Sequence, residues 1–310
     1  MSKSENPGAK LLDVAIHKVG PDARALARRV TPLPAKRKIS ALLSSSVESD
    51  EGVITAKTGH KFMAIQEPVF LQVRYDGIYE KELSRVMQLF VSTGDVIADV
   101  GANFGWHTVS LAAKVGPSGH VHCFEPNAEM FSALSSNIEI NHLGRRVTAV
   151  NAAVGESSGF GELNADAGQS AIGFMKHSST GTSESAIPIV SLDEALAAHI
   201  GQVAFVKIDV EGFEPFVLNG AEKLLRSENP PVVMIEFSPE ALERQPIEIS
   251  EFLDNIRSLG AEMTLPINGK LEVVTSPPLD VVTNLFMLPK KGRYAVKVED
   301  ANVALAIING

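Results

Sequence analysis

The chain has 310 residues, of which 45% are hydrophobic and 21% are charged. This balance is typical of one globular body, with or without an appendage, and it excludes a chain disordered throughout or a collagen-like repeat. The single cysteine, Cys123, excludes an internal disulfide and a four-cysteine zinc site, so we expect a reducing, cytoplasmic setting. The sequence predicts neither a membrane span nor a secretion signal.

The formal net charge of −9 is unevenly distributed along the chain. Residues 1–50 hold nine Lys or Arg and five Asp or Glu, a net of +4, which leaves −13 on residues 51–310. Because phosphate binding needs a basic face, the acidic body argues against a nucleic-acid partner and suits a cationic ligand. We expect residues 1–50 to form a basic extension that ends in a serine-rich linker.

The next segment, residues 51–94, is expected to form a small cap. Residues 52–75 alternate in short runs broken by Gly59 and Pro68, which predicts a β meander. Residues 80–90 carry apolar side chains at the 3.6-residue period of a helix.

A different pattern begins at residue 95. Short, β-branched, largely apolar runs alternate with helical patterns, and this alternation predicts a mostly parallel sheet with helices on both faces. The expected strands are 96–100, 121–124, 147–154, 203–210 and 232–237. The expected helices are 106–115, 128–141, 192–199, 215–225 and 249–259.

Two stretches depart from this rhythm. Residues 154–187 are rich in Gly, Ser, Thr and Ala, which indicates a β-hairpin excursion or a mobile loop. Residues 262–265, 270–274 and 283–288 have strand composition, with Asn268-Gly269 as a hairpin turn, so we expect a final antiparallel pair. We assign residues 95–290 to one domain and 291–310 to a C-terminal tail.

A glycine-rich turn, Gly101 to Gly105, follows the first strand of the sheet. Ligands of open α/β sheets bind at such strand-to-helix turns, although glycine there can also serve close packing. The dinucleotide fingerprint G-x-G-x-x-G is absent, since Asn103 and Trp106 occupy two of its positions. The second strand ends in Glu125, where a carboxylate can bind the ribose hydroxyls of an adenosine. Together these features predict an adenosine-containing ligand.

The fourth strand ends in alternating charged residues, Lys207, Asp209 and Glu211. A strand points all three to one side, and because ionised groups are costly inside a sheet, we expect them to line a crevice. The alternative is a structural ion pair of Lys207 with one of the carboxylates, with Glu214 capping the next helix. Glu236 on the neighbouring strand could share a site with Asp209. Such carboxylates could bind Mg²⁺ or Ca²⁺, but we favour direct base chemistry and predict no metal site.

Other polar residues carry weaker signals. His107 follows the glycine turn and could pack near a ligand. His120 and His122 alternate on one strand, but no third metal ligand is evident. Tyr79-Glu80 precedes the first helix and could close over a ligand or simply pack.

Several motifs together resemble the FkbM-type family of class I S-adenosylmethionine-dependent methyltransferases. They are DVGANFGWHT (99–108), FEPN (124–127), Asn137 with Asn141, VKIDVEGFEPFVLNGA (206–221) and TNLF (283–286), within a match over residues 76–288. The resemblance implies a Rossmann-like, seven-stranded, mostly parallel sheet with an antiparallel C-terminal strand. It also implies methyl transfer to a hydroxyl of a sugar, polyketide or other small metabolite.

The resemblance assigns roles to residues. The methionine part of S-adenosylmethionine is expected at Asp99, Gly101, Ala102, Asn103 and Gly105, and the ribose at Glu125 with Pro126. Asn151 and Ala153 are expected near the adenine. The predicted catalytic residues are Asp209, Glu211, Lys207 and Glu236.

The sequence also bears on the methyl acceptor and on two rival functions. Nucleic-acid amino-methyltransferases usually carry a D/N-P-P-aromatic tetrad after the fourth strand, where this chain reads Asp209-Val210-Glu211-Gly212, so we predict O-methylation of a small-molecule acceptor. The first rival is a nicotinamide-dependent oxidoreductase, but this chain lacks the G-x-G-x-x-G fingerprint that such an enzyme uses to bind its cofactor. A non-catalytic adenosine-ligand-binding partner subunit would keep the same fold. The sequence carries no signal for the oligomeric state.

Overall fold

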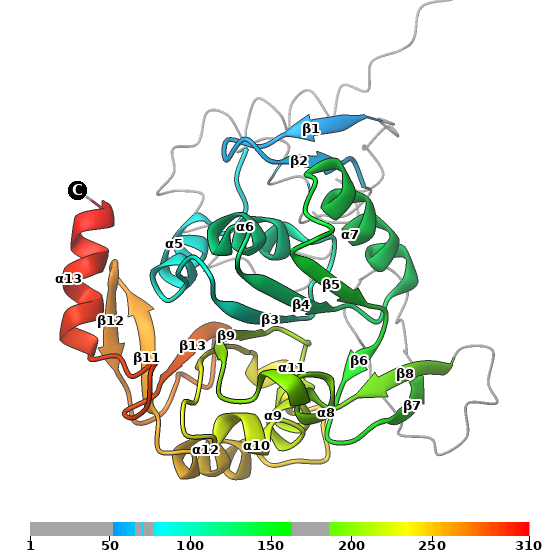
Figure 1. Cartoon of the computed structure of the whole chain (residues 1–310). Coiled ribbons are helices and arrows are strands. Elements are labelled where there is room, and N and C mark those ends of the chain that lie inside the picture. The colour runs from blue at the N-terminus through cyan, green and yellow to red at the C-terminus, as the bar shows by residue number, and fades with distance from the viewer. Residues whose placement is uncertain (1–51, 66–69, 71–72, 74–76, 163–185, 310) are drawn as a thin grey trace, which may run out of the picture.

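A computed structural model of the protein describes residues 52–65, 70, 73, 77–162 and 186–309. Its centre is one large sheet (Figure 1). The strands are β3 (Val96–Val100), β4 (His120–Phe124), β5 (Val147–Val150), β9 (Val203–Ile208), β10 (Val232–Phe237), β11 (Glu262–Ile267), β12 (Lys270–Val273) and β13 (Thr283–Leu288). Their order is β12-β11-β13-β10-β9-β3-β4-β5.

The pairing of these strands confirms the predicted fold class. The neighbouring strands β10, β9, β3, β4 and β5 run parallel, and β13 inserts antiparallel between β10 and β11. The sheet has eight strands instead of the seven that the resemblance implied, because the hairpin at Asn268-Gly269 adds β12 at the edge. The strand order reverses between β3 and β9, and such switch points are where open α/β sheets bind ligands.

Helices cover both faces of the sheet (Figure 1). On one face lie α5 (Lys81–Leu89), α6 (Trp106–Val115) and α7 (Ala128–Ile140). On the other lie α8 (Leu192–Ala195), the 3₁₀ turn η1 (Ala197–His199), α9 (Glu214–Asn219), α10 (Glu222–Leu225), α11 (Pro239–Leu242) and α12 (Ile249–Ser258). All six residues of β9 are buried, as expected for a central parallel strand that is covered twice.

The local sequence explains where α7 begins. The side chain of Asn127 caps α7 by accepting hydrogen bonds from the backbone N–H groups of Glu129 and Met130. The helix predicted over 215–225 is divided into α9 and α10. The four-residue helix α11 was not predicted.

A β-hairpin of the predicted cap packs above α6 and α7 (Figure 1). Its strands are β1 (Val53–Thr55) and β2 (Lys61–Met63). The third strand expected in this meander is not found at the two described residues of that run, because Phe70 and Val73 are helical. Both side chains are buried in the core beneath the hairpin.

Asn137 of α7 and Asn141, which follows the last residue of that helix, hold the hairpin in place. Asn137, fully buried, accepts from the backbone N–H of Met63 at 2.7 Å and donates to the carbonyl of Phe104 at 2.8 Å. Asn141 accepts from the N–H of Lys61 at 2.9 Å and donates to its carbonyl at 2.7 Å. The hairpin is thereby tied directly to the turn that follows β3.

The interval between the third and fourth parallel strands forms a second sheet. It contains β6 (Ala153–Val154), β7 (Gly159–Glu162) and β8 (Ala186–Val190), in the order β6-β8-β7. The antiparallel pairing of β7 with β8 confirms the expected hairpin at its base. Residues 163–185 lie outside the described residues, as does the predicted basic extension.

The segment expected to be a tail contains a helix, α13 (Val298–Asn309). Asn302 donates to the carbonyl of Leu271 at 2.9 Å and accepts from its N–H at 2.7 Å, so α13 covers the edge strand β12. Within the described part of the chain, no helix is both long and apolar enough to cross a membrane.

Candidate active site

The carboxyl ends of β3, β4, β9 and β10 meet at one edge of the sheet and surround a cleft of about 150 Å³. Most of the residues predicted to form a site lie around it. The lining consists of Tyr79, Gly101, Ala102, Asn103, Phe104, Trp106, His107, Glu125, Lys207, Asp209, Val210, Glu211 and Glu236.

The glycine turn forms one wall of the cleft. Gly101 has φ +75°, and a β-carbon there would lie 1.8 Å from the backbone oxygen of Asp209. Gly105 has φ +91°, and a β-carbon there would lie 2.6 Å from Leu134 of α7. Both positions therefore need glycine for close packing inside the protein, one of the two roles that the sequence left open.

Asp99 and Lys207 form a buried ionic group behind this wall. Lys207 Nζ lies 3.0 Å from Asp209 Oδ2 and 3.6 Å from Asp99 Oδ1, and it donates to the Gly101 carbonyl at 3.2 Å. Thr108 Oγ1 donates to the other oxygen of Asp99 at 2.6 Å. Burial lowers the pKa of Lys207, but the two carboxylates raise it more, so it stays above the usual lysine value. Lys207 is therefore a permanent cation that fixes both acids.

Glu125 lies on the same side of the cleft. Its Oε2 accepts from the N–H of Asn103 at 2.7 Å, and its Oε1 accepts from the N–H of Asn127 at 2.9 Å. Burial raises the pKa of Glu125 to about 7, although these two hydrogen bonds act in the opposite direction. Each carboxylate oxygen has a second lone pair, so Glu125 can accept further hydrogen bonds from a diol.

A small apolar pocket adjoins the cleft at Gly101 and Val210. Pro126, Ala153 and Phe213 contribute to its lining. Asn151 is exposed and stands outside this lining, but its side chain donates to the carbonyls of Glu125 at 2.8 Å and Pro126 at 3.2 Å. The pocket has a volume of only about 10 Å³, and Asn151 fixes the backbone at its rim.

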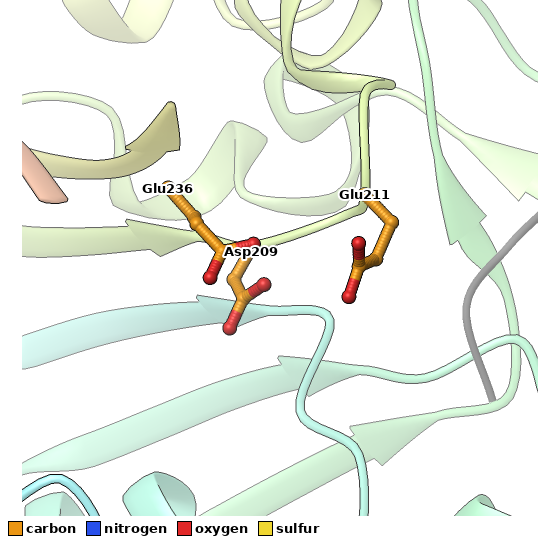
Figure 2. Close-up of side chains that lie close together, drawn as sticks. All are labelled: Asp209, Glu211 and Glu236. Atoms are coloured by element: carbon orange, nitrogen blue, oxygen red, sulfur yellow. The ribbon is translucent and has the colours of Figure 1, made fainter. Parts of the chain in front are cut away.

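Three carboxylates form a second wall of the cleft. Asp209, Glu211 and Glu236 offer oxygen atoms that all lie within 4.8 Å of one another, and Figure 2 shows the side chains gathered in one place. The parallel pairing of Ile235 with Ile208 sets Glu236 next to Asp209. Glu211 joins them from a tight turn in which its own φ is +54°.

The side chain of Glu214 stabilises that turn through hydrogen bonds to its backbone. Fully buried, it accepts from the N–H groups of Val210 at 3.2 Å and Gly212 at 3.1 Å. The capping role that the sequence suggested for Glu214 is thus directed at the turn between β9 and α9.

The carboxylates of this wall hinder one another's ionisation. The charge of Asp209, followed by burial, raises the pKa of Glu236 well above its usual value. Desolvation and the charge of Asp209 raise the pKa of Glu211 to about 7, although part of its side chain is exposed. Near neutral pH the cluster can therefore take up a proton, as a general base must, and it can also attract a cation.

Sequence reasoning left five cleft residues out of the predicted site, namely Tyr79, Phe104, Trp106, His107 and Val210. Tyr79 and His107 were noted only as neighbours, and Trp106 was taken as the first apolar residue of a helix. Their arrangement depends on how α5 packs against α6, which periodicity does not report. His120 and His122 lie at the opposite end of β4, where His199 of η1 has its ring 5.0 Å from that of His122. Among the described residues, the three-ligand group close enough for a metal is the carboxylate cluster.

The fold defines a class of protein, a Rossmann-like α/β fold, and the cleft lies at the switch point of its sheet. The family described as the methyltransferase FkbM domain matches residues 99–263, more than half of the chain. The protein therefore belongs to the FkbM methyltransferase family.

Individual relatives are more distant. The hexuronic acid methyltransferase AglP of Haloferax volcanii is 30% identical over 158 residues, which cover 50% of this chain and 62% of AglP. This chain thus spans less than two thirds of that relative.

Solved structures of two methyltransferases also match. A SAM-dependent O-methyltransferase from Thermotoga maritima is 17% identical, with a TM-score of 0.38 over 76% of this chain and 77% of that one. An rRNA methylase from Streptococcus thermophilus is 10% identical, with a TM-score of 0.37 over 66% of this chain and 92% of that one.

Proposed function

We propose that the protein is an S-adenosylmethionine-dependent methyltransferase that methylates a hydroxyl group of a sugar, a polyketide or another small metabolite. The observation that carries this proposal is the cleft with two unlike walls, in a member of a methyltransferase family. The glycine turn and Glu125 form the cofactor wall, and Asp209, Glu211 and Glu236 form the acceptor wall.

The proposed cofactor position follows from the chemistry of each part of the site. The ribose hydroxyls donate to Glu125, and the adenine lies against the apolar surface of Pro126 and Ala153, where the small pocket has to widen to admit it. The methionine part lies along the turn from Gly101 to Gly105, which Asp99 supports from behind through Lys207. The sulfonium then faces the carboxylate wall, where negative charge stabilises it.

The reaction requires little covalent chemistry from the protein. The acceptor oxygen attacks the sulfonium methyl group in line, so that an O–CH₃ bond forms while the S–CH₃ bond breaks and S-adenosylhomocysteine is released. The hydroxyl proton passes to the carboxylate cluster. Because the three carboxylates titrate as a coupled group, we assign the base to Asp209, Glu211 and Glu236 together. Lys207 orients Asp209.

A second mechanism is favoured by the close approach of the three carboxylates. A divalent cation held by their oxygens would lower the pKa of the acceptor hydroxyl in place of a base. The two mechanisms separate on treatment with EDTA. Direct base chemistry keeps its rate after chelation, whereas a metal-dependent reaction stops and returns with added Mg²⁺.

The acceptor class follows from the relative and from the charge of the cleft. AglP is named for a hexuronic acid, which points to carbohydrate hydroxyls as acceptors. A second anion would be repelled by Asp209, Glu211 and Glu236 unless a cation bridges them. Without a bound cation, we therefore expect neutral sugars to be better acceptors than sugar acids.

Calorimetry with S-adenosylhomocysteine and with NAD tests the cofactor. We expect the protein to bind S-adenosylhomocysteine and not NAD. Glu125→Gln should lower the affinity for S-adenosylhomocysteine about tenfold or more, because it weakens a charge-assisted pair of hydrogen bonds. Preference for NAD would favour an oxidoreductase.

Transfer of an isotopic methyl group to a metabolite extract, with Asp209→Ala as control, tests catalysis. Binding of S-adenosylhomocysteine without any transfer would favour a non-catalytic partner subunit.

We further propose that residues 95–290 form the catalytic domain, residues 51–94 a cap that contributes to acceptor binding, and residues 1–50 an extension. The buried, free Cys123 is compatible with the cytoplasmic setting that we propose.

A further inference from the structure

Glu80 adopts an unusual backbone conformation at the edge of the cleft. Its φ of 44° and ψ of 53° are left-handed, and it precedes α5 without capping the helix through its side chain. This region of φ and ψ strains a residue with a β-carbon, and Gly or Asn usually occupies it. Strained residues of this kind concentrate at functional sites, so the role of the Glu80 side chain needs an explanation.

The side chain of Glu80 reaches the helix that follows the glycine turn. Glu80 Oε2 lies 3.0 Å from Nε2 of His107, the second residue of α6. Burial raises the pKa of Glu80, but the hydrogen bond and the charge of His107 lower it, and the net shift is downward. An ionised Glu80 therefore joins the start of α5 to the start of α6.

Tyr79 lies against this contact. The centroid of its ring is 6.0 Å from that of His107, and the ring meets that of Trp106 edge-on, with centroids 6.4 Å apart. Burial and the charges of Glu80, Asp209 and Glu236 raise the pKa of Tyr79. The phenol thus stays protonated and can donate to Glu80, which orients the ring where it lines the cleft.

We propose that Tyr79 contacts the sulfonium centre of the bound cofactor, and that Glu80 is the positioning residue that holds Tyr79 there through its bond to His107. An aromatic ring attracts a cation, and Tyr79 lines the same cleft as Asp209 and Glu236. Tyr79 would therefore discriminate between S-adenosylmethionine, a cation at sulfur, and the neutral sulfur of S-adenosylhomocysteine. The inference rests on the proposed function and adds a determinant of cofactor charge to it.

The test measures the affinities of both nucleosides for the full chain by calorimetry. Tyr79→Leu removes the ring and is expected to weaken S-adenosylmethionine binding about tenfold while changing S-adenosylhomocysteine binding about threefold or less. Tyr79→Phe keeps the ring and should retain most of the preference. Emission from Trp106, the single tryptophan of the chain, gives an independent readout of cleft occupancy.

Glu80→Gly separates positioning from stability. It removes the carboxylate and also relieves the left-handed strain, so we expect an unchanged or higher melting temperature together with an affinity for S-adenosylmethionine about tenfold lower. Glu80→Gln keeps an oxygen acceptor and should lose less. Glu82→Gln, which removes an exposed carboxylate from the first turn of the same helix, is the matched control and should change neither quantity.

The outcomes separate the two proposals. If the wild-type protein binds neither nucleoside, the proposed function fails and this inference fails with it. If the wild type binds both but Tyr79→Leu and Glu80→Gly bind S-adenosylmethionine within twofold of it, only this inference is overturned. Equal losses for both nucleosides, or losses that follow the melting temperature, would also overturn it, because they indicate a purely structural role.

Discussion

The two walls of the cleft use their polar groups in opposite ways. On the cofactor wall, both oxygens of Glu125 and the buried Asp99 are engaged by neighbouring protein groups. On the acceptor wall, Glu211 and Glu236 receive no hydrogen bond from the described residues, and their pKa values are raised. The first wall uses its charges to maintain its shape, whereas the second keeps protonation chemistry available.

Substitutions of the groups that give the cofactor wall its shape, Asp99, Lys207 and Gly101, should therefore act mainly on folding, and substitutions on the acceptor wall mainly on turnover. Lys207 belongs to both walls because it contacts Asp99 and Asp209. The experiments below test this division, beginning with the largest expected effect.

Lys207→Met should lower the free energy of unfolding by about 3–5 kcal/mol, because it leaves Asp99 buried without a counter-ion. Urea denaturation measures the loss. Adding Asp99→Asn in the same chain should restore part of the stability, and Lys223→Met at an exposed position is the control. A loss below 1 kcal/mol would mean that this ion pair does not maintain the cofactor wall.

Gly101→Ala should cost about 3 kcal/mol or more, since the new β-carbon meets the Asp209 carbonyl and the residue keeps a positive φ. Gly144→Ala is matched to it, because a β-carbon there meets nothing within 4 Å, and it should change stability by less than about 1 kcal/mol. Thermal melts compare the two. Similar melting temperatures would show that the turn is not closely packed against β9.

Asp209→Asn should reduce methyl transfer about 100-fold, as expected on disabling a general base, while changing S-adenosylhomocysteine affinity less than threefold. The amide can still accept a hydrogen bond from Lys207, which limits damage to folding. Steady-state kinetics with labelled cofactor measure the loss, with Asp254→Asn on the exposed face of α12 as control. A variant with normal turnover would remove Asp209 from the catalytic group.

The acceptor wall should also make turnover depend on pH. Because Glu211 has a pKa of about 7, its base form increases as the pH rises from 6 to 8, and kcat/KM should rise about tenfold per unit below the midpoint. A flat or falling profile over this range would contradict the base assignment.

Stability should change in the opposite direction over the same pH range. A carboxyl group with a raised pKa in the folded state stabilises that state at low pH, and this contribution is lost as the pH rises through about 7. Glu211→Gln should therefore raise the melting temperature at pH 8 but not at pH 4. An equal effect at both values would show that the charge of Glu211 is not the cause.

Asn137→Ala should have the smallest effect of this series, about 1 kcal/mol, because it removes the bridge between Met63 and Phe104. Denaturant titration measures the change. Ser136→Ala, one residue earlier on the exposed side of α7, provides the comparison. Equal stabilities would show that the hairpin is held by other contacts.

Local sequence was sufficient to predict the parallel core of the fold. The strands around residues 96–100 and 232–237 and the helix over 106–115 repeat apolar residues at regular intervals, and the structure confirms them. The helix α13 was missed, because its alternating small and apolar residues gain stability from covering β12, a contact distant in sequence. The prediction of a third strand in the meander was wrong at Phe70 and Val73, where tertiary burial overrides strand propensity.

The candidate site was predictable only where one strand carries its own pattern. The alternation of Lys207, Asp209 and Glu211 pointed to one crevice, and the cleft contains all three. The sequence could not show that Lys207 turns inward to Asp99, nor that Gly101 is required by Asp209. Tyr79 lines the cleft through the packing of α5 on α6, whereas the sequence indicated only that Tyr79-Glu80 could close over a ligand or simply pack.

A crystal structure of the protein with S-adenosylhomocysteine would test the central claim most directly. The account predicts the ribose hydroxyls on Glu125, the adenine beside Pro126 and Ala153, and the sulfur directed at Asp209, Glu211 and Glu236. Density for the nucleoside elsewhere on the molecule, or a fully soaked crystal with no nucleoside in this cleft, would contradict it.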